Sequence, residues 1–230
     1  ILAPGIEIYQ GDCLDIMQGL DDNSIDTIIT DPPYGLQFMG KEWDKGVPGI
    51  MFWAEMLRVA KPGAILMAMG GTRTYHRLVC AIEDAGWEIK DMIEWVYGSG
   101  FPKSHNIGNN IEDDKWDGWG TALKPAHEPI CVAMKSRDGT YVNNALTWGV
   151  AGLNIDGGRV DYEDGGDAAS NPLYRKNNDY KINYGKDKAP TSYKLKDKSG
   201  EMNINSKGRW PANHIHDGSD EVMACFPDKA

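Results

Sequence analysis

The chain has 230 residues, of which 41% are hydrophobic and 25% charged, a balance typical of a globular protein with a substantial core. No apolar run approaches the roughly 18–20 residues of a membrane span and no signal-peptide pattern opens the sequence, so we expect a cytoplasmic protein with no membrane partner. The four cysteines show no CxxC pair, which predicts a reduced protein without disulfides or a zinc site. The net charge of −10 excludes a nucleic-acid partner unless basic residues are concentrated in one segment.

The first part of the chain predicts two strands and a short helix. GIEIYQGD (5–12) and SIDTIITD (24–31) are rich in β-branched residues and bounded by turn formers, so both are expected to be strands. CLDIMQGL (13–20), between them, has the pattern of a short helix that ends near Gly19.

Two further helix–strand pairs follow. PGIMFWAEMLRVAKPGAILMAMGG predicts a helix, a Lys-Pro-Gly stop and an apolar strand from Ala64 to Met69. TRTYHRLVCAIEDAGW predicts a helix capped by Gly86, and two more strands are expected at 88–98 and 128–135. Strands that alternate with helices predict an α/β protein with a parallel, doubly wound sheet covered on both faces. Ligands of such sheets bind at the carboxyl ends of the strands.

The composition changes at about Asn154. Residues 154–210 are polar, rich in Asn, Lys, Gly and Tyr, and weakly periodic, which favours either an inserted recognition segment or a long mobile loop. Between 173 and 210, ten Lys or Arg residues less four Asp or Glu residues leave a charge of +6. We therefore divide the chain into a catalytic part (1–153), an insertion (154–210) and a return toward the core (211–230).

The segment ITDPPYG, at the end of the second predicted strand, has the residues that methylation of a nucleobase amino group requires. The lone pair of that nitrogen is delocalised into the ring, and two hydrogen-bond acceptors at its N–H groups would free it. Asp31 can supply one acceptor and the carbonyl of Pro32 the other, with Pro32 and Pro33 fixing the backbone. Tyr34 can stack on a base that has left the duplex. The alternative is an ordinary strand-ending turn with a packed tyrosine.

The chain resembles amino-group DNA methyltransferases of the permuted (β-type) order, most closely phage and prophage members. The likeness lies in GDCLDIM, SIDTIITDPPYGLQFMGKEWD, the helix–strand segments that follow, WDGWGTALKPAHEPICVAMK and GRWPANHI. It implies a Rossmann-like fold, S-adenosylmethionine as cofactor, and methyl transfer to a flipped base in double-stranded DNA. It also implies that Asp12, with Cys13 beside it, contacts the cofactor, and that Asp31 lies between cofactor and target amine. An aspartate at this position favours adenine N6 over cytosine N4.

One family motif is missing from the sequence. The glycine-rich cofactor loop of the form D-P-F-x-G-S-G, which in this order follows the recognition segment, does not occur among the 230 residues. We therefore expect a fold that lacks the C-terminal cofactor-loop strands, and weak binding of S-adenosylmethionine by this chain alone. A complementary chain fragment is one way in which the loop could be supplied.

Several basic residues are candidates for DNA contacts. Arg73 and Lys103 lie near expected strand ends, and Lys194, Lys196 and Lys198 lie in the basic stretch among interleaved tyrosines. For each of them solvated surface is the alternative. Trp43, Trp116 and Trp119 flank the site in sequence, with core packing as their alternative. His214 and His216, in HIH, are expected in an exposed strand or loop, and we assign no metal.

Three functions remain open from the sequence. The first is a DNA amino-methyltransferase, adenine-N6 or cytosine-N4. The second is a protein-glutamine methyltransferase, which Asp31 and the basic insertion disfavour, because that tetrapeptide usually starts with asparagine. The third is a non-catalytic DNA-binding remnant, which the missing glycine loop keeps open. Members of the family act with a partner restriction endonuclease or alone, and the sequence does not decide between the two.

Overall fold

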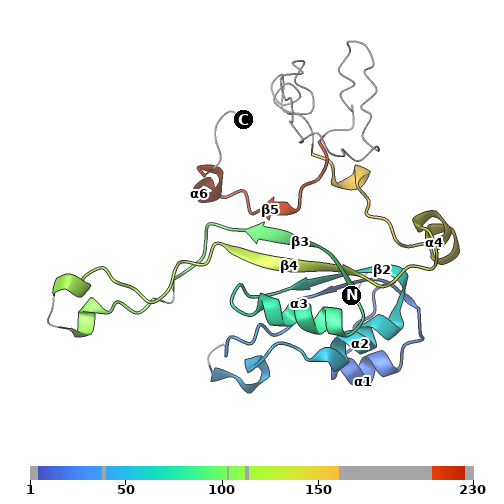
Figure 1. Cartoon of the computed structure of the whole chain (residues 1–230), viewed down its shortest axis with the longest axis horizontal. Helices are drawn as coiled ribbons and strands as arrows, with labels where there is room; N and C mark the ends of the chain where they lie inside the picture. The colour runs from blue at the N-terminus through green and yellow to red at the C-terminus, as the bar shows by residue number, and fades with distance from the viewer. Residues whose placement is uncertain (1–4, 38–39, 103, 112–113, 161–208, 226–230) are drawn as a thin grey trace, which may run out of the picture. The chain divides into compact units, whose positions relative to one another are not determined.

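The computed structural model describes residues 5–37, 40–102, 104–111, 114–160 and 209–225 (Figure 1). The chain divides into two compact units. One comprises Ile1–Leu153 with Ala212–Phe226, and the other Asn154–Pro211 with Pro227–Ala230. All the sheet and all the α-helices described below belong to the first unit.

The first unit is built on a mixed sheet in the strand order β1-β2-β4-β3-β5. Parallel pairs join β1 (Ile25–Thr30) to β2 (Ala60–Met69) and β3 (Glu88–Val96) to β5 (His214–His216). Between them, β4 (His127–Met134) runs antiparallel to both β2 and β3. The expected α/β class is confirmed, and so are the strands expected near 24–31, 88–98 and 128–135.

The expectation of a purely parallel sheet is wrong at β4. The connection from β3 to β4, residues 97–126, contains no α-helix in its described part, only the short 3₁₀ turns η3 (Gly108–Asn110) and η4 (Asp114–Trp116). A parallel neighbour needs a crossover that is usually helical, whereas a hairpin-like excursion returns the chain antiparallel. As a consequence β4 begins at the edge of the sheet where β2 and β3 end.

The strand expected at 5–12 is absent. Residues 6–10 have no regular secondary structure, and Ile6, Ile8 and Tyr9 are all exposed. A strand forms by pairing with another strand, and no described strand pairs with this segment. The short helix that follows is confirmed as α1 (Cys13–Gln18), with Gly19 as its C-cap.

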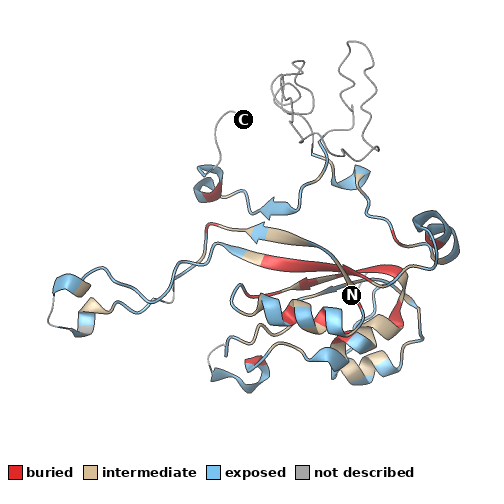
Figure 2. Ribbon diagram, viewed as in Figure 1, coloured by how far each residue is buried: buried red, intermediate tan, exposed pale blue. Residues whose placement is uncertain are grey.

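Helices α2 (Ile50–Val59) and α3 (Tyr75–Asp84) cover one face of the sheet. Trp53 of α2 and Leu78 and Ile82 of α3 pack with Leu66 of β2 and are at most 1% exposed. Figure 2 shows buried segments on α3 and along β4. As expected, glycine follows α3, where Gly86 has φ +104°. The other face carries a smaller cluster of Ile65, Val132 and Met134, and Ile29 of β1 is 66% exposed there. Coverage of both faces is therefore incomplete in the described residues.

Strand β2 begins earlier than the Lys-Pro-Gly stop predicts. It starts at Ala60, and its register with β1 shifts between the pairs Ile25↔Ala60 and Thr27↔Ile65. Pro62 cannot donate to the ladder and Gly63 has φ +79°, so these residues form an irregular stretch within the strand. Helix α4 (Tyr141–Trp148) is tied to this stretch by the buried Asn144, whose Nδ2 donates to Pro62 O at 2.9 Å.

Of the second unit, residues 154–160 and 209–211 are described. Val160 and Arg209 exchange two backbone hydrogen bonds of 3.3 and 2.7 Å, and the Arg159 guanidinium lies 5.0 Å from the centre of the Trp210 ring. The 3₁₀ turn η5 (Asp156–Gly158) precedes this bridge.

A last helix, α6 (Asp220–Met223), belongs to the first unit. Among the helices placed in the structure, none is long and apolar enough to cross a membrane.

Candidate active site at the end of strand β1

The ends of β1 and β2 and the start of β4 lie side by side at one end of the sheet, which we call its carboxyl edge. β1 pairs with β2 up to Thr30↔Ala68, and β2 pairs with β4 up to Met69↔Ile130. Asp31 follows β1, and Glu128 lies near the start of β4. Because β4 is antiparallel, its first residues reach the edge where the parallel pair ends. The predicted site residues Asp31–Tyr34 therefore sit where the loops of the sheet gather.

Tyr34 is the most extensively contacted member of the predicted tetrapeptide. Its hydroxyl donates to Glu128 Oε2 at 3.3 Å, and its carbonyl accepts from Thr74 Oγ1 at 2.5 Å. The ring lies against Gly71, where an added Cβ would be 3.3 Å from Tyr34 Cδ2. Burial and the neighbouring carboxylates of Asp31 and Glu128 raise the pKa of the Tyr34 phenol far above its usual value. The Tyr34 hydroxyl is thus a neutral hydrogen-bond donor, and the residue as a whole is half-buried.

Asp31 is exposed, while Pro32 and Pro33 are half-buried. The two prolines restrict φ at successive positions and carry no N–H, so the backbone between Asp31 and Tyr34 has little freedom. Asp31 also contributes to the raised pKa of Tyr34, so its carboxylate lies close enough to the Tyr34 hydroxyl for the two groups to interact. An exposed carboxylate and a neighbouring carbonyl on a rigid turn are the acceptors that an amine substrate needs.

Sequence reasoning missed Asp44, a carboxylate that is 2% exposed and closes the short 3₁₀ helix η2 (Glu42–Asp44). Its two oxygens accept from the backbone N–H groups of Gly35 at 2.7 Å and Leu36 at 3.2 Å. Glu128 and Thr74 were missed as well. Glu128 and Thr74 contact Tyr34 from 94 and 40 residues away, and Asp44 contacts amides eight and nine residues earlier, so no short motif marks any of the three.

Asp12 and Cys13, the residues predicted to hold the cofactor, lie at the start of α1 and are exposed. The Asp12 carboxylate caps this helix by accepting from Leu14 N at 2.8 Å. Arg58 of α2 donates to Met17 O at 2.7 Å and so holds α1 against α2. Within the described residues, no hydrogen bond joins Asp12 to Asp31 or Tyr34, so Asp12 is not part of the Tyr34 network.

Of the predicted DNA contacts, Arg73 is described and exposed, in the turn that Thr74 N closes by donating to Gly71 O at 3.0 Å. That turn supports Tyr34, so Arg73 lies at the same edge as Asp31. Lys103 and the three lysines of the insertion, Lys194, Lys196 and Lys198, lie outside the described residues.

The tryptophans near the site in sequence are not core residues. Trp43 is 62% exposed and Trp119 58% exposed. Trp116 and Trp119 form an edge-to-face pair with ring centres 5.7 Å apart, on the excursion between β3 and β4. His214 and His216 are in the exposed strand β5, as expected. Among the described side chains, no group of three or more His, Cys, Asp or Glu could hold a metal ion.

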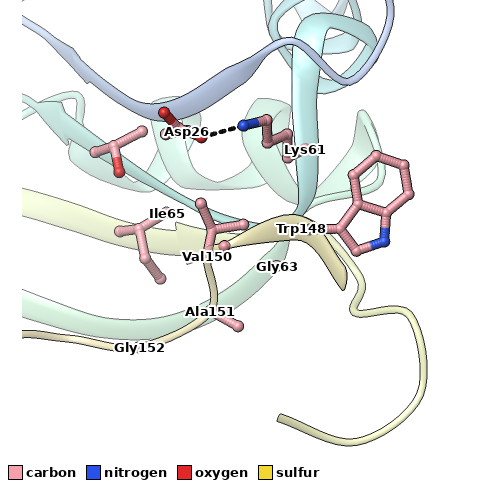
Figure 3. A pocket seen from close by; sticks show the side chains of 10 residues that line it. Asp26, Lys61, Gly63, Ile65, Trp148, Val150, Ala151 and Gly152 are labelled. Atoms are coloured by element: carbon pink, nitrogen blue, oxygen red, sulfur yellow. Dashed lines mark hydrogen bonds and ion pairs between the residues drawn. The ribbon is translucent and has the colours of Figure 1, made fainter. Parts of the chain in front are cut away.

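A cavity of about 510 Å³ lies at the opposite edge of the sheet, where β1 and β2 begin (Figure 3). Asp26 and Lys61 form an ion pair on one side of it, and Trp148 and Ala151 line the other (Figure 3). Asp26 and Asp31 are separated by five residues, or about 16 Å along an extended strand. This cavity is therefore distinct from the Asp31 site.

The α/β sheet, with an acidic loop after β1, is of the class of proteins that bind ligands at the carboxyl ends of parallel strands. A family model described as DNA methylase, of the N6/N4 type, matches residues 25–227. The chain therefore belongs to the N6/N4 DNA methylase family, and its fold is of the Rossmann-like α/β class expected from the sequence.

The individual relatives and solved structures share limited sequence identity with the chain. The chain is 27% identical over 179 residues to the type II methyltransferase M.HindIII of Haemophilus influenzae, a match that covers 56% of this chain and 57% of that protein. A crystal structure of the M1.HpyAVI–SAM complex is 22% identical, with a TM-score of 0.38 over 58% of this chain and 55% of that one. The cytosine-N4-specific PvuII DNA methyltransferase is 17% identical, with a TM-score of 0.40 over 70% and 59%. Both TM-scores are below 0.5, so the family assignment rests on the family match.

Proposed function

We propose that this chain carries the catalytic and DNA-recognition residues of a DNA methyltransferase that methylates the N6 amino group of an adenine flipped out of double-stranded DNA. The observation that carries the proposal is the rigid Asp31–Tyr34 loop at the end of β1, with Tyr34 held by Glu128 and Thr74. Asp31 and the Pro32 carbonyl accept hydrogen bonds from the two N–H groups of the target amine. These bonds draw the nitrogen toward tetrahedral geometry, while Tyr34 stacks on the base.

S-adenosylmethionine supplies the electrophilic methyl group when bound. The exposed carboxylates of Asp12 and Asp31 fit the ammonium and amino groups of this cofactor, because an ionised carboxylate is acceptor-only. Asp12 already accepts from Leu14 N through one oxygen, which leaves the other for the cofactor. Cys13, directly after it, is exposed at the same helix start. The sequence has no counterpart of the family's glycine-rich loop. Asp12, Cys13 and Asp31 therefore account for only part of a cofactor site.

The DNA is proposed to be held by Arg73 at the site edge and by the insertion at 154–210, including Lys194, Lys196 and Lys198. The charge of +6 over residues 173–210 of the insertion, opposite in sign to that of the whole chain, supports this role. Reversing the charge of these three lysines together should weaken DNA binding and reduce its dependence on salt concentration. Unchanged affinity would assign DNA binding to another part of the chain.

The deciding experiment is methyl transfer from labelled S-adenosylmethionine to unmethylated DNA, followed by digestion and identification of the labelled nucleoside. Label in N6-methyl-2′-deoxyadenosine supports the proposal, and label in N4-methyl-2′-deoxycytidine supports the cytosine alternative. The variant Asp31→Ala should abolish transfer and leave DNA binding intact. Asp26→Asn is the matched control, since Asp26 is an exposed carboxylate on the same strand that faces the opposite edge. DNA binding without transfer, also after a glycine-rich segment is supplied, supports a non-catalytic DNA-binding protein.

A further inference from the structure

Asp44 is a buried carboxylate that the proposed chemistry does not use. It is 2% exposed, and its oxygens accept from two successive backbone amides, Gly35 N at 2.7 Å and Leu36 N at 3.2 Å. These amides follow directly after Tyr34. Burying a carboxylate is costly unless its oxygens are hydrogen-bonded, so the position of this charge is tied to the position of the two amides.

The backbone around Asp44 reinforces the same contact. Gln37 N donates to Asp44 O at 2.8 Å. Gly35 has φ +68°, and an added Cβ would lie 3.0 Å from Gly46 C and from Val47 N. Residues 35–37 thus lie against 44–47 with no space for a side chain at Gly35. The glycine after the tyrosine is explained by this close approach.

The loop that carries Asp31 is consequently fixed at both ends. Its start is held by β1, where Thr30 pairs with Ala68, and its end is held by Asp44. We propose that Asp44 is a positioning residue, which keeps the Asp31 carboxylate and the Pro32 carbonyl at the separation that the two N–H groups of the target amine require. This inference rests on the proposed function, because the amine is the substrate that it assigns.

The first test is hydrogen exchange, which needs no activity. In the segment 30–37 the prolines have no amide, so the signal comes from a few residues that include Gly35 and Leu36. Asp44→Asn removes one acceptor, and exchange at Gly35 and Leu36 should become at least about tenfold faster. The control is Glu42→Gln in the same 3₁₀ helix, whose exposed carboxylate pairs with Lys45. Equal exchange in the two variants overturns the proposal.

The second test is methyl-transfer kinetics with the same variants. A loop displaced by about 1 Å should lower kcat about 100-fold. KM for DNA should change by less than about threefold, because the contacts proposed for Arg73 and the insertion lie outside this loop. An unchanged kcat overturns the positioning role. If Asp44→Asn does not fold, as judged by circular dichroism, Asp44→Glu keeps the charge and should show an intermediate rate. If the wild-type chain transfers no methyl group to any DNA, the proposed function fails, and the exchange experiment still decides whether Asp44 holds the loop.

Discussion

Replacing Asn144 by alanine should destabilise the first unit more than the same replacement of its neighbour Asn143 on α4. The Asn144 side chain is fully buried, with Nδ2 donating to Pro62 O at 2.9 Å and to Val150 O at 3.0 Å. Its Oδ1 accepts from Asp138 N at 2.8 Å. The site is tight, since a Cβ added to Gly63 would lie 2.5 Å from Asn144 Nδ2. Alanine would therefore leave three backbone groups without their partner.

An unsatisfied buried polar group costs about 1–3 kcal/mol, so three of them would give about 3–9 kcal/mol. A water molecule can enter the space vacated, and we therefore expect the low end, about 3 kcal/mol. For a domain of this size that loss lowers Tm by about 6–12 °C. Asn143→Ala is the control, because Asn143 is exposed and its Nδ2 donates to Asp138 O at 2.9 Å, its one hydrogen bond among the described residues. The helix-propensity gain is the same in both variants and cancels in the comparison.

Urea unfolding followed by far-ultraviolet circular dichroism measures the difference. The midpoint for Asn144→Ala should fall well below that for Asn143→Ala, with an unchanged slope of unfolding free energy against urea concentration. A difference of less than about 1 kcal/mol between the variants would mean that water or α4 itself satisfies the three groups. The reasoning from buried hydrogen bonds would then be refuted for this helix.

Three further outcomes are expected. Gly35→Ala should lower both stability and methyl transfer, because of the left-handed φ and the contact with Gly46; a urea melt and a transfer assay with wild-type values would contradict this. Tyr34→Ala should weaken binding of an extruded base by about 1–3 kcal/mol, seen as lower 2-aminopurine fluorescence at the target. Tyr34→Phe should lose little of this binding. Its methyl-transfer rate should follow the wild-type profile from pH 7 to 10, because the raised pKa keeps the wild-type phenol protonated there. Burial raises the pKa of the Cys131 thiol to about 11. The thiol's contribution to folding stability should therefore be complete below the unfolded pKa near 9 and fall by up to about 2–3 kcal/mol as the pH rises toward 11. Cys131→Ala should flatten this loss of stability, and a wild-type dependence of stability on pH in the variant would exclude the thiol as its cause.

The features that the sequence predicted well are those specified by nearby residues. The β-branched segment 25–30, followed by Asp31 and two prolines, specifies where β1 ends and the site loop begins. Gly19 and Gly86 mark helix ends, and at Gly86 the left-handed φ of +104° favours glycine itself. Each of these features depends on a few consecutive residues, and so each could be inferred before the fold was known.

The features that the sequence did not predict depend on partners far along the chain. A strand pattern at 5–12 does not produce a strand unless another strand pairs with it. The direction of β4 depends on whether 97–126 returns as a hairpin or crosses over as a helix. Asp44 has the sequence context of any surface aspartate, and its importance comes from amides eight and nine residues earlier. The predicted roles of Asp12, Cys13 and Arg73 remain predictions.

The edge position of β1 has a consequence for handling the protein in solution. Among the described strands, β1 pairs with β2 alone, and its outer edge presents the backbone of a β-branched segment in which Ile29 is 66% exposed. Such an edge can recruit the same segment of another molecule, the first step of ordered aggregation. Pro32 and Pro33 cannot join a ladder, so they stop any intermolecular sheet at Thr30. Besides holding the site loop, the two prolines thus limit the length of chain that can template self-association.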